Sequence, residues 1–420
     1  MIIPEGWTRD SLGVVSLLLK DGTHGSHERV SDGIPICSAE NITPAGKLEW
    51  NGEVSRVSRE DYSQIHAKYS IKPNDLLLTI VGSIGRSALA PYISEQYTIQ
   101  RSIAVIRPDT TRVSSKYLYQ VSRGEAFQRE LARRSNTTAQ SGIYLGELSK
   151  ISLLLPPLPE QKKIAAILSS VDETIEATQE TIEQTKKVKQ GLMQELLTKG
   201  IGHTRFKKTE IGEIPENWRM LRVKDVIHIM DSGWSPTCLA EQATEDNWGV
   251  LKTTCCVWEG FNQYENKALP SNLKPRPSLE VSTGDILVTR AGPLERVAVV
   301  VCVHTTRGKL MLSDKLIRVK ANPEISHFPF LALSLSTRNA QKHLLGRKTG
   351  LAASQTNISQ KILANTPIAV PQLSEQRRIS AILSSIDKNV KSEKDVLQQL
   401  QLLKKGLMQD LLTGKVRVAV

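Results

Sequence analysis

A 39-residue segment occurs twice in this chain, and a long repeat of this kind limits the folds that the chain can adopt. The copy "EQKKIAAILSSVDETIEATQETIEQTKKVKQGLMQELLT" begins at Glu160, and "EQRRISAILSSIDKNVKSEKDVLQQLQLLKKGLMQDLLT" begins at Glu375. Equivalent residues lie 215 positions apart without a gap, as Pro156 and Pro371 do. Agreement is near complete at the two ends of the segment and weak in its middle. The pattern indicates an internal duplication.

Both copies carry apolar residues in alternating steps of four and three, the heptad pattern of a coiled coil. A helix of 39 residues spans about 58 Å and is rarely stable unless its apolar stripe is covered. We therefore expect each copy to be one long helix, with the other copy as its cover. The residues expected to pack are Ile164, Leu168, Val171, Ile175, Ile182, Leu192 and Leu196 in the first helix and Leu383, Ile386, Val390, Leu397, Leu400, Leu407 and Leu411 in the second.

Proline and glycine mark the expected limits of the helices. Pro157 and Pro159, like Pro371, are expected just ahead of each helix, where a missing amide proton is harmless, and Gly200 and Gly414 are stop signals.

Gly191 and Gly406 lie inside the helices, where glycine costs about 1 kcal/mol relative to alanine. They could be tolerated weak spots near frayed ends. Their recurrence within "GLMQELLT" and "GLMQDLLT" instead favours close approach of another backbone, so we predict tight helix crossing at both glycines.

The duplication extends beyond the helices into the rest of the chain. "IPEGW" at residues 3–7 matches "IPENW" at 214–218, and "NDLLLTIVGSIGR" from Asn74 matches "GDILVTRAGPLER" from Gly284. The second pair predicts a polar turn, an apolar strand and another turn. Each globular part is expected to close with a polar loop, a short helix or turn, and an apolar strand. The expected domains are 1–155 and 201–370, with spacer helices in 156–200 and 371–420.

Between these matching segments the two globular sequences share almost nothing. A duplicated chain whose helices stayed similar while its globules diverged is typical of a protein that presents two different binding surfaces on one scaffold.

Composition narrows the partners of the chain. Lys and Arg number 55 against 43 Asp and Glu, which gives a net charge of +12 and favours a polyanionic partner, with nucleic acid the leading candidate. The N-terminus lacks a leader pattern, and no apolar stretch approaches the roughly 18 residues of a membrane helix, so we expect a cytoplasmic protein without membrane contact. Five cysteines without paired spacing suggest reduced thiols, with neither a disulfide framework nor a zinc site.

Motifs for catalysis are missing from the sequence. We find no Asn/Asp-Pro-Pro-aromatic loop of an amino-methyltransferase, no phosphate-binding GxxxxGK[ST] loop, no G-x-S-x-G and no H-E-x-x-H. For His24 and His27 in "GTHGSH" we expect no acidic or cysteine companion nearby, which favours a polar loop over a metal site. The sequence predicts a non-catalytic chain without a metal site.

Polar and basic loops remain as candidate contacts to DNA. Arg and Lys can form hydrogen bonds with guanine, Asn and Gln can form them with adenine, and Ser or Thr can bind phosphates or base edges. Any one such residue can equally be a solvated surface residue, but clusters occur at equivalent places in both halves, just before the closing polar loop. The candidates are Arg86, Gln100, Arg101, Arg133, Arg134, Thr137 and Gln140 in the first half and Arg290, Lys315, Arg347, Lys348, Gln355 and Asn357 in the second.

The repeated segments "PPLPEQKKIAAILSSVDETI" and "PQLSEQRRISAILSSIDKNV", together with "NDLLLTIVGSIGR" and "SQTNISQKILANTPIAVPQL", carry a family resemblance over the whole length. The chain resembles the specificity (S) subunit of a type I restriction-modification system. The resemblance implies a mixed α/β (α+β) fold in which two long antiparallel coiled-coil helices, related by a pseudo-two-fold internal repeat, separate two target-recognition domains. Each domain would read one half of a bipartite, asymmetric site in double-stranded DNA.

The resemblance also implies partners. Two modification subunits would dock on the helices and methylate adenine with S-adenosylmethionine, and restriction subunits would add ATP- and Mg-dependent translocation and cleavage. The S subunit itself would need no cofactor. The main alternative is a non-catalytic coiled-coil adaptor whose globules bind protein, and a fused nuclease or methyltransferase comes last.

Overall fold

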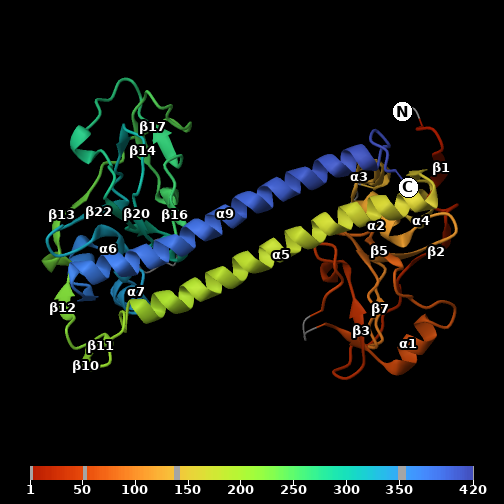
Figure 1. Ribbon diagram of the computed structural model, residues 1–420, viewed down its shortest axis with the longest axis horizontal. Coiled ribbons are helices and arrows are strands. Elements are labelled where there is room, and N and C mark those ends of the chain that lie inside the picture. The colour runs from red at the N-terminus through yellow and green to blue at the C-terminus, as the bar shows by residue number, and fades with distance from the viewer. Residues whose placement is uncertain (1–2, 51–53, 137–141, 349–355, 420) are drawn as a thin grey trace. The chain divides into compact units, whose positions relative to one another are not determined.

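The computed structural model describes residues 3–50, 54–136, 142–348 and 356–419 (Figure 1). Two compact units make up the chain: residues 1–180 with 394–420, and residues 181–393. The long helices α5 (Leu158–Leu196) and α9 (Leu373–Leu411) each contribute one part to each unit. Each unit is therefore one globule with a segment of both helices.

The first globule is built on antiparallel strands. A four-stranded sheet has the order β2-β8-β5-β6, a three-stranded sheet has the order β4-β3-β7 with β3 and β7 parallel, and β1 pairs with β9. The strands are β1 (Thr8–Ser11), β2 (Ser16–Asp21), β3 (Ile34–Cys37), β4 (Arg56–Val57), β5 (Leu76–Thr79), β6 (Ser87–Leu89), β7 (Thr98–Ile99), β8 (Ile103–Pro108) and β9 (Ser152–Leu155). The helices are α1 (Arg59–Ile65), α2 (Ser115–Arg123), α3 (Glu125–Arg134) and α4 (Leu145–Leu148).

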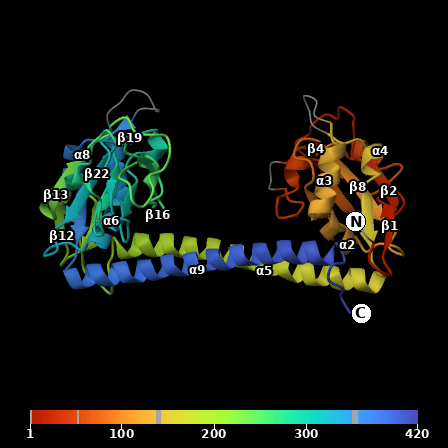
Figure 2. The ribbon, with the colours of Figure 1, turned by 90° about the horizontal axis from the view of Figure 1, so that it is seen from above.

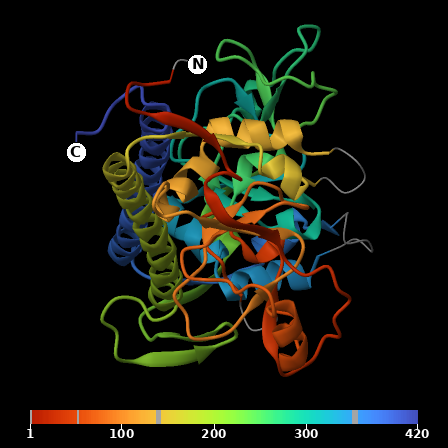
Figure 3. The same cartoon turned by 90° about the vertical axis from the view of Figure 1, so that its right-hand side faces the viewer.

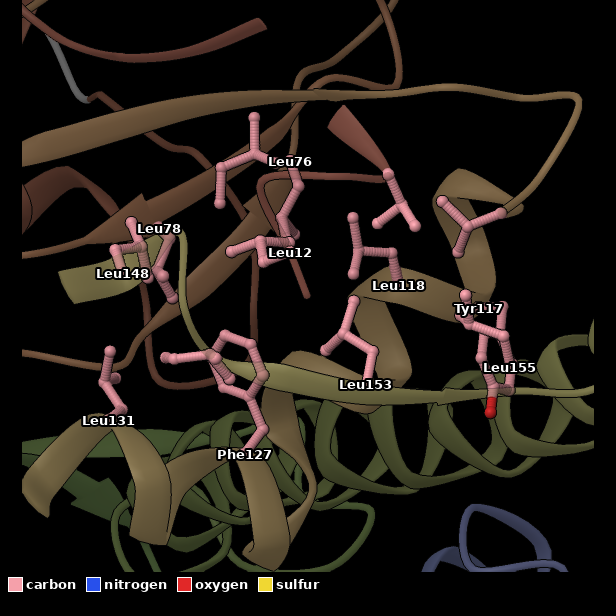
Figure 4. Close-up of a cluster of buried hydrophobic side chains, with 14 of the residues drawn as sticks. Leu12, Leu76, Leu78, Tyr117, Leu118, Phe127, Leu131, Leu148, Leu153 and Leu155 are labelled. Atoms are coloured by element: carbon pink, nitrogen blue, oxygen red, sulfur yellow. The ribbon is translucent and has the colours of Figure 1, made fainter. Parts of the chain in front are cut away.

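One core joins this globule to the long helices. Alternate residues of β5, Leu76 and Leu78, pack with Tyr117 and Leu118 of α2 and with Phe127 of α3 (Figure 4). The same cluster includes residues of α5 and α9, namely Ile164, Leu168, Leu407 and Leu411. Burial of this apolar surface ties the helix pair to the globule within the first unit.

The second globule repeats the topology of the first, although the two sequences have diverged. Its sheets have the orders β13-β22-β18-β20 and β17-β14-β21, with β14 and β21 parallel, and β12 pairs with β24. These strands are β12 (Arg219–Arg222), β13 (Ile227–Ser232), β14 (Gly249–Leu251), β17 (Asn266–Ala268), β18 (Ile286–Thr289), β20 (Val300–Cys302), β21 (Leu310–Met311), β22 (Leu316–Ala321) and β24 (Pro367–Val370). The helices are α6 (Phe328–Leu335), α7 (Arg338–Gly346) and α8 (Gln360–Ala364).

Three further strand pairs lie in the second unit. They are β10 (Phe206–Thr209) with β11 (Gly212–Pro215), β15 (Cys256–Val257) with β16 (Gly260–Phe261), and β19 (Ala291–Gly292) with β23 (Thr356–Asn357). The second unit also joins its globule to both long helices, because Trp218 and Phe330 share a core cluster with Leu196 of α5 and with Ile379 and Leu383 of α9.

The two long helices run antiparallel within each unit. In the first unit the start of α5 lies beside the end of α9, and in the second unit the end of α5 lies beside the start of α9 (Figure 2). Figure 3, which faces the first unit, shows both helices at one side of its globule. The predicted helices and their antiparallel pairing are confirmed.

The limits of the helices agree closely with the prediction. Both helices have 39 residues, and their first residues, Leu158 and Leu373, are 215 positions apart. Pro159 lies inside the first turn of α5 rather than ahead of it, which is harmless because that amide has no partner within the helix. Gly200 and Gly414 follow the helices with φ of +67° and +71°, a conformation that glycine adopts without strain.

The strands predicted in the repeated segments from Asn74 and Gly284 are confirmed as β5 and β18. The closing helix and strand of each globule are α4 with β9 and α8 with β24. Among the described residues, no helix combines the length and the apolar composition that a membrane span requires.

Candidate nucleic-acid interface

In the first globule, backbone hydrogen bonds bring two segments with predicted contact residues together at one edge of the globule. We call this place, and its equivalent in the second globule, the contact edge. After β5, the amide of Ile80 donates to the carbonyl of Ser102 (2.8 Å), and the amide of Ile143 donates to the carbonyl of Ile80 (2.9 Å). The turn with Gln100 and Arg101 therefore lies next to the end of the closing loop. Two of the segments that carry predicted contact residues are therefore neighbours in this globule, and their role in DNA binding stays a prediction.

The second globule uses the same backbone scheme with different side chains. The amide of Arg290 donates to the carbonyl of Lys315 (2.8 Å), and the amide of Ile358 donates to the carbonyl of Arg290 (2.9 Å). Strand β23, which includes Asn357, pairs with β19 directly after Arg290. Three of the predicted contact residues thus meet at one edge.

The predicted contact residues differ in how accessible they are. Those at exposed positions can reach a ligand without rearrangement, whereas the half-buried ones present only part of their side chains. Exposed are Arg101, Arg133, Lys315, Arg347 and Lys348, and half-buried are Arg86, Gln100, Arg134, Arg290 and Asn357. Thr137, Gln140 and Gln355 lie outside the described residues.

Some of these cations already have partners within the chain. Arg134 binds Glu130 (3.2 Å) and Glu147 (3.0 Å), and Arg133 also binds Glu130 (2.9 Å). The hydrogen bond from Arg133 is the main cause that lowers the pKa of Glu130, and Arg134 adds to it. The pKa of Glu147 is lowered first by its hydrogen bond from Lys150 and second by the one from Arg134. Because both of its carboxylate partners would have to be released, Arg134 is less available for DNA than the exposed Arg101 or Lys315.

Two glutamines support the turn that follows β5 or β18, and the sequence analysis did not find them. Gln128 Nε2 donates to the carbonyls of Gly85 (2.9 Å) and Ser122 (2.6 Å). Gln341 Nε2 donates to the carbonyls of Ala298 and Leu335, both at 2.9 Å. Gly85 and Ala298 are equivalent residues with positive φ, so the same support recurs where the sequences differ. An alignment of the two halves by helix position would have matched these glutamines.

The Glu-Gln pair at the start of each long helix anchors the globule. Gln161 Nε2 donates to the carbonyls of Pro156 and Arg112, both at 2.9 Å, and its Oε1 accepts from the amide of Ser114. Gln376 makes the same three bonds, with Pro371, Ile325 and the amide of His327. A buried amide side chain with all three bonds satisfied fixes the angle between helix and globule.

The neighbouring glutamates, Glu160 and Glu375, bind the segment that enters each globule. Trp7 Nε1 donates to Glu160 (3.2 Å), and Trp218 Nε1 donates to Glu375 (3.1 Å). This explains why the "IPEGW" and "IPENW" segments recur.

Each glutamate also binds the segment that follows the opposite helix. Arg417 makes two bonds of 2.9 Å to Glu160, and His203 Nε2 lies 2.7 Å from Glu375. The hydrogen bond from Arg417 is the main cause that lowers the pKa of Glu160.

The apolar seam residues of both helices are buried or half-buried, as the heptad pattern indicates. Gly191 and Gly406 are different: both are exposed, and no heavy atom lies within 4 Å of the position that a Cβ would take. The predicted tight crossing of the two helices at these glycines is wrong. The reason is their heptad position, two residues after a seam residue, which faces away from the other helix.

The glycines belong to a set of exposed, uncharged residues that we call the outer stripe. All lie one residue before or two residues after a seam position, if the polar residues Lys189 and Lys404, which continue the same steps of four and three, are counted in the seam. In the first unit the stripe comprises Ile167, Ser170, Thr174, Ala177, Val396, Gln399, Leu403 and Gly406, and in the second Ile382, Ser385, Asn389, Ser392, Thr181, Gln184, Val188 and Gly191. Every residue of one stripe is 215 positions from a residue of the other.

The residues of each stripe come from both helices but lie on one face of the helix pair. The two-fold axis that exchanges two antiparallel helices brings the same side of each helix to the same face of the pair. The opposite flank of α5 faces the first globule, since Asp172 accepts from Gln120 Nε2 (3.0 Å) and Glu176 pairs with Lys47. An exposed helix face usually carries charge, so a stripe without charge indicates a surface for a partner.

Among the described residues, no three His, Cys, Asp or Glu side chains cluster as a metal site would require. His24 lies beside Asp21 (2.5 Å) and His27 beside Asp61 (3.0 Å), so the expectation that these histidines have no acidic companion nearby is wrong. The described cysteines are free thiols. Two hollows in the second unit, of about 270 and 520 Å³, lie beside Lys320 and are lined by side chains of mixed charge.

Comparison with known proteins agrees with this arrangement. The family profile "Type I restriction modification DNA specificity domain" matches residues 29–187 and 215–402. The specificity subunit of the type I restriction enzyme EcoEI from Escherichia coli is 42% identical over 194 residues, which are 45% of this chain and 33% of that one. The putative specificity subunit of MjaX from Methanocaldococcus jannaschii is 29% identical over 426 residues, with 99% and 95% covered.

Solved structures share the fold. The crystal structure of the S subunit of a type I restriction-modification system from M. genitalium matches with a TM-score of 0.57 at 18% identity, covering 98% of this chain and 96% of that one. A chain from a structure on complex assembly and conformational transition of the type I R-M system matches with a TM-score of 0.58 at 17% identity, covering 99% and 100%.

Proposed function

Because the chain belongs to the type I restriction-modification DNA specificity family, we propose that it reads a bipartite, asymmetric DNA site with one globule for each half-site. The protein is a non-catalytic DNA-recognition subunit, in keeping with its family. The residues that touch DNA and the subunits that join the complex are the parts that the proposal adds.

One observation carries the proposal: the two globules have the same strand order and the same backbone frame at one edge, yet different side chains there. The turn that contains Arg101 in the first globule is equivalent in position to the turn that contains Asp314 and Lys315 in the second. A shared frame with different edge residues is what the reading of two different half-sites requires. Arg, Lys, Gln and Asn at this edge can bind base edges and phosphates.

Phosphate contacts supply most of the affinity in this proposal. The exposed cations Arg101, Lys315, Arg347 and Lys348 would neutralise phosphates and release counterions, so binding should weaken steeply with salt. In this proposal the half-buried residues Gln100 and Asn357 would contact bases directly. The net charge of +12 has the sign that this requires.

The two outer stripes support docking of two modification subunits. The stripes have equivalent residues in the two units, so each can bind the same surface of one kind of partner. Ile167 with Leu403 and Ile382 with Val188 provide apolar contact, and Gly406 and Gly191 allow a partner backbone to approach closely. In the proposed complex these partners bind S-adenosylmethionine and methylate adenine, and restriction subunits that use ATP and Mg join through them.

Mapping methylated adenines tests the proposed function. Genomic DNA from cells that produce the modification subunits with this chain should carry methyladenine at one bipartite motif, and cells without the chain should lack it. Exchange of residues 1–155 for the first globule of a relative should alter one half of the motif only. If methylation does not depend on the chain, or if both halves change together, the proposal is wrong.

A further inference from the structure

The strand β2 is followed directly by Gly22, whose backbone crosses closely over the backbone of β7. A Cβ on Gly22 would lie 2.2 Å from the carbonyl oxygen of Ile99 and 2.4 Å from that of Gln100, so no other residue fits without a shift of the backbone. The amide of Thr23 donates to the carbonyl of Ile99 (3.0 Å), and the amide of Arg101 donates to the carbonyl of Thr23 (3.1 Å). This crossing fixes Thr23 beside Gln100 and Arg101.

The segment after Gly22 is held by a chain of side-chain hydrogen bonds. Thr23 Oγ1 lies 2.7 Å from His27 Nε2, and His27 Nδ1 lies 3.0 Å from Asp61 Oδ1. Ser58, the residue before α1, donates to Asp61 Oδ2 (3.0 Å) and accepts from the amide of Asp61. These bonds lower the pKa of Asp61, which is therefore ionised at neutral pH. The segment is thus tied at Thr23 to the edge and at His27 to α1.

Several side chains between and after these ties point to solvent. Four of them are exposed: His24, Ser26, Glu28 and Arg29. Each carries a donor or acceptor group that can form hydrogen bonds with base edges or phosphates. They follow a crossing that lies next to Arg101, which is itself exposed.

The second globule keeps the same crossing with different residues. A Cβ on Gly233 would lie 1.7 Å from the carbonyl oxygen of Leu312, and the amide of Trp234 donates to that carbonyl (3.0 Å). Ser235 bonds to Asp314, the neighbour of Lys315. The two globules have little sequence in common, yet in both the chain passes from the end of the equivalent strand, β2 or β13, to the predicted contact edge. The crossing is a shared feature of the frame, and the residues after it vary.

We propose that residues 23–29 are a second DNA-contact segment of the first globule. The hydrogen bonds that link Thr23, His27 and Asp61 position this segment, which contacts the same half-site as Gln100 and Arg101. The proposal rests on the proposed function and adds His24, Ser26 and Arg29 to its contact residues. Thr23 and His27 are positioning residues, because their side chains are engaged in the hydrogen bonds that hold the segment. Trp234 and Ser235 begin the corresponding segment of the second globule.

The first experiment separates contact from position. The full chain is purified with its modification subunits, and binding is measured with synthetic duplexes that carry the mapped site or single-base changes in it. Thr23→Val removes the hydroxyl that meets His27 and should lower discrimination at positions in the first half-site roughly 5- to 150-fold. Thr23→Ser keeps the hydroxyl and should restore it.

The second half-site is an internal control in every measurement, because nothing in the second globule changes. The double substitution His24→Ala with Arg29→Ala should weaken binding and alter the base preference of the first half-site, while the melting temperature stays unchanged. Arg101→Ala is the reference variant for the same edge.

Two results would overturn the inference. If Thr23→Val and the double variant leave the first half-site unchanged while Arg101→Ala alters it, residues 23–29 do not contact DNA, and the proposed function stands. If the unaltered complex shows no preference between the site and its base changes, the proposed function itself fails. A change at both half-sites would indicate a general structural effect and would also contradict the inference.

Discussion

Asp172 and Lys404 form an ion pair between α5 and α9 in the first unit, and the equivalent residues exchange roles in the second unit, where Lys189 pairs with Asp387. Each partner is 215 positions from its counterpart. One interaction is thus made twice, as expected for a self-complementary interface. The two copies differ in exposure: the side chain of Lys404 is 11% exposed, and that of Lys189 is 25% exposed.

This difference predicts unequal costs for two chemically identical substitutions. Asp172→Ala leaves Lys404 buried without its carboxylate, which should cost about 3–5 kcal/mol of unfolding free energy. The same substitution removes the acceptor of Gln120 Nε2, so Gln120→Ala is measured alongside to subtract that contribution. Burial is already the main cause that lowers the pKa of Lys404, and the positive charge of Arg123 adds to it. Asp387→Ala breaks the exposed copy and should cost about 0–1 kcal/mol. Urea unfolding of the two variants measures both values.

The double variant Asp172→Leu with Lys404→Met serves as the control, because it removes both charges at once. It should recover most of the stability that Asp172→Ala loses. Equal losses for Asp172→Ala and Asp387→Ala would show that burial does not set the value of this ion pair.

The outer stripes predict a stepwise loss of partner subunits. Leu403→Asp places a charge in the stripe of the first unit and should weaken docking there by about 2 kcal/mol or more, roughly thirtyfold in the dissociation constant. Val188→Asp should do the same in the second unit. Native mass spectrometry should then find one modification subunit with each single variant and none with the double variant. Lys405→Asp, an exposed residue outside the stripe, should retain two.

The candidate DNA contacts separate into available and engaged cations. Arg101→Ala should lower the slope of log affinity against log salt by about 0.9, the effect of one lost phosphate contact. Arg134→Ala should leave the slope unchanged and lower stability, because Arg134 binds Glu130 and Glu147. Fluorescence anisotropy between about 50 and 200 mM salt measures the slope. A larger slope change for Arg134→Ala than for Arg101→Ala would contradict this assignment.

The sequence predicted the helices well because their signal is local and periodic. Steps of four and three identify Leu168 and Leu383 as seam residues, and both are fully buried. The same reasoning failed at Gly191 and Gly406, since recurrence shows that a residue matters but not which direction it faces. Heptad position would have placed both glycines on the outside.

The candidate site was only partly predictable. Basic clusters near Arg101 and Lys315 were visible in sequence, but the crossing at Gly22 joins residues about 80 positions apart and has no local pattern. Likewise, the partners of His27 are Thr23 and Asp61, and the second of these becomes a neighbour only through the fold. Long-range contacts of this kind depend on strand order, which one sequence does not specify.

The pair of Glu160 and Arg417 predicts a defined pH dependence. Since the folded state holds the pKa of Glu160 below its ordinary value of about 4.3, the pair stabilises the fold above that value, and the contribution is lost as pH falls through the lowered pKa. Arg417→Ala should therefore destabilise the first unit at neutral pH and make little difference in strong acid. Melting temperatures of both proteins between pH 7 and the acid limit test this. A difference that persists unchanged in acid would exclude the ion pair as its cause.

The helix pair predicts how the recognised site responds to helix length. The ion pairs in both units keep one register, so an insertion in α5 alone would disrupt pairing, whereas matched insertions of one heptad near Thr178 in α5 and near Leu397 in α9 would preserve it. Seven residues add about 10 Å of helix, and a DNA base pair rises about 3.4 Å. The gap between half-sites should therefore lengthen by about three base pairs while both half-sites keep their sequences. Methylation mapping reads the gap directly, and an unchanged gap with intact methylation would show that the helices do not set it.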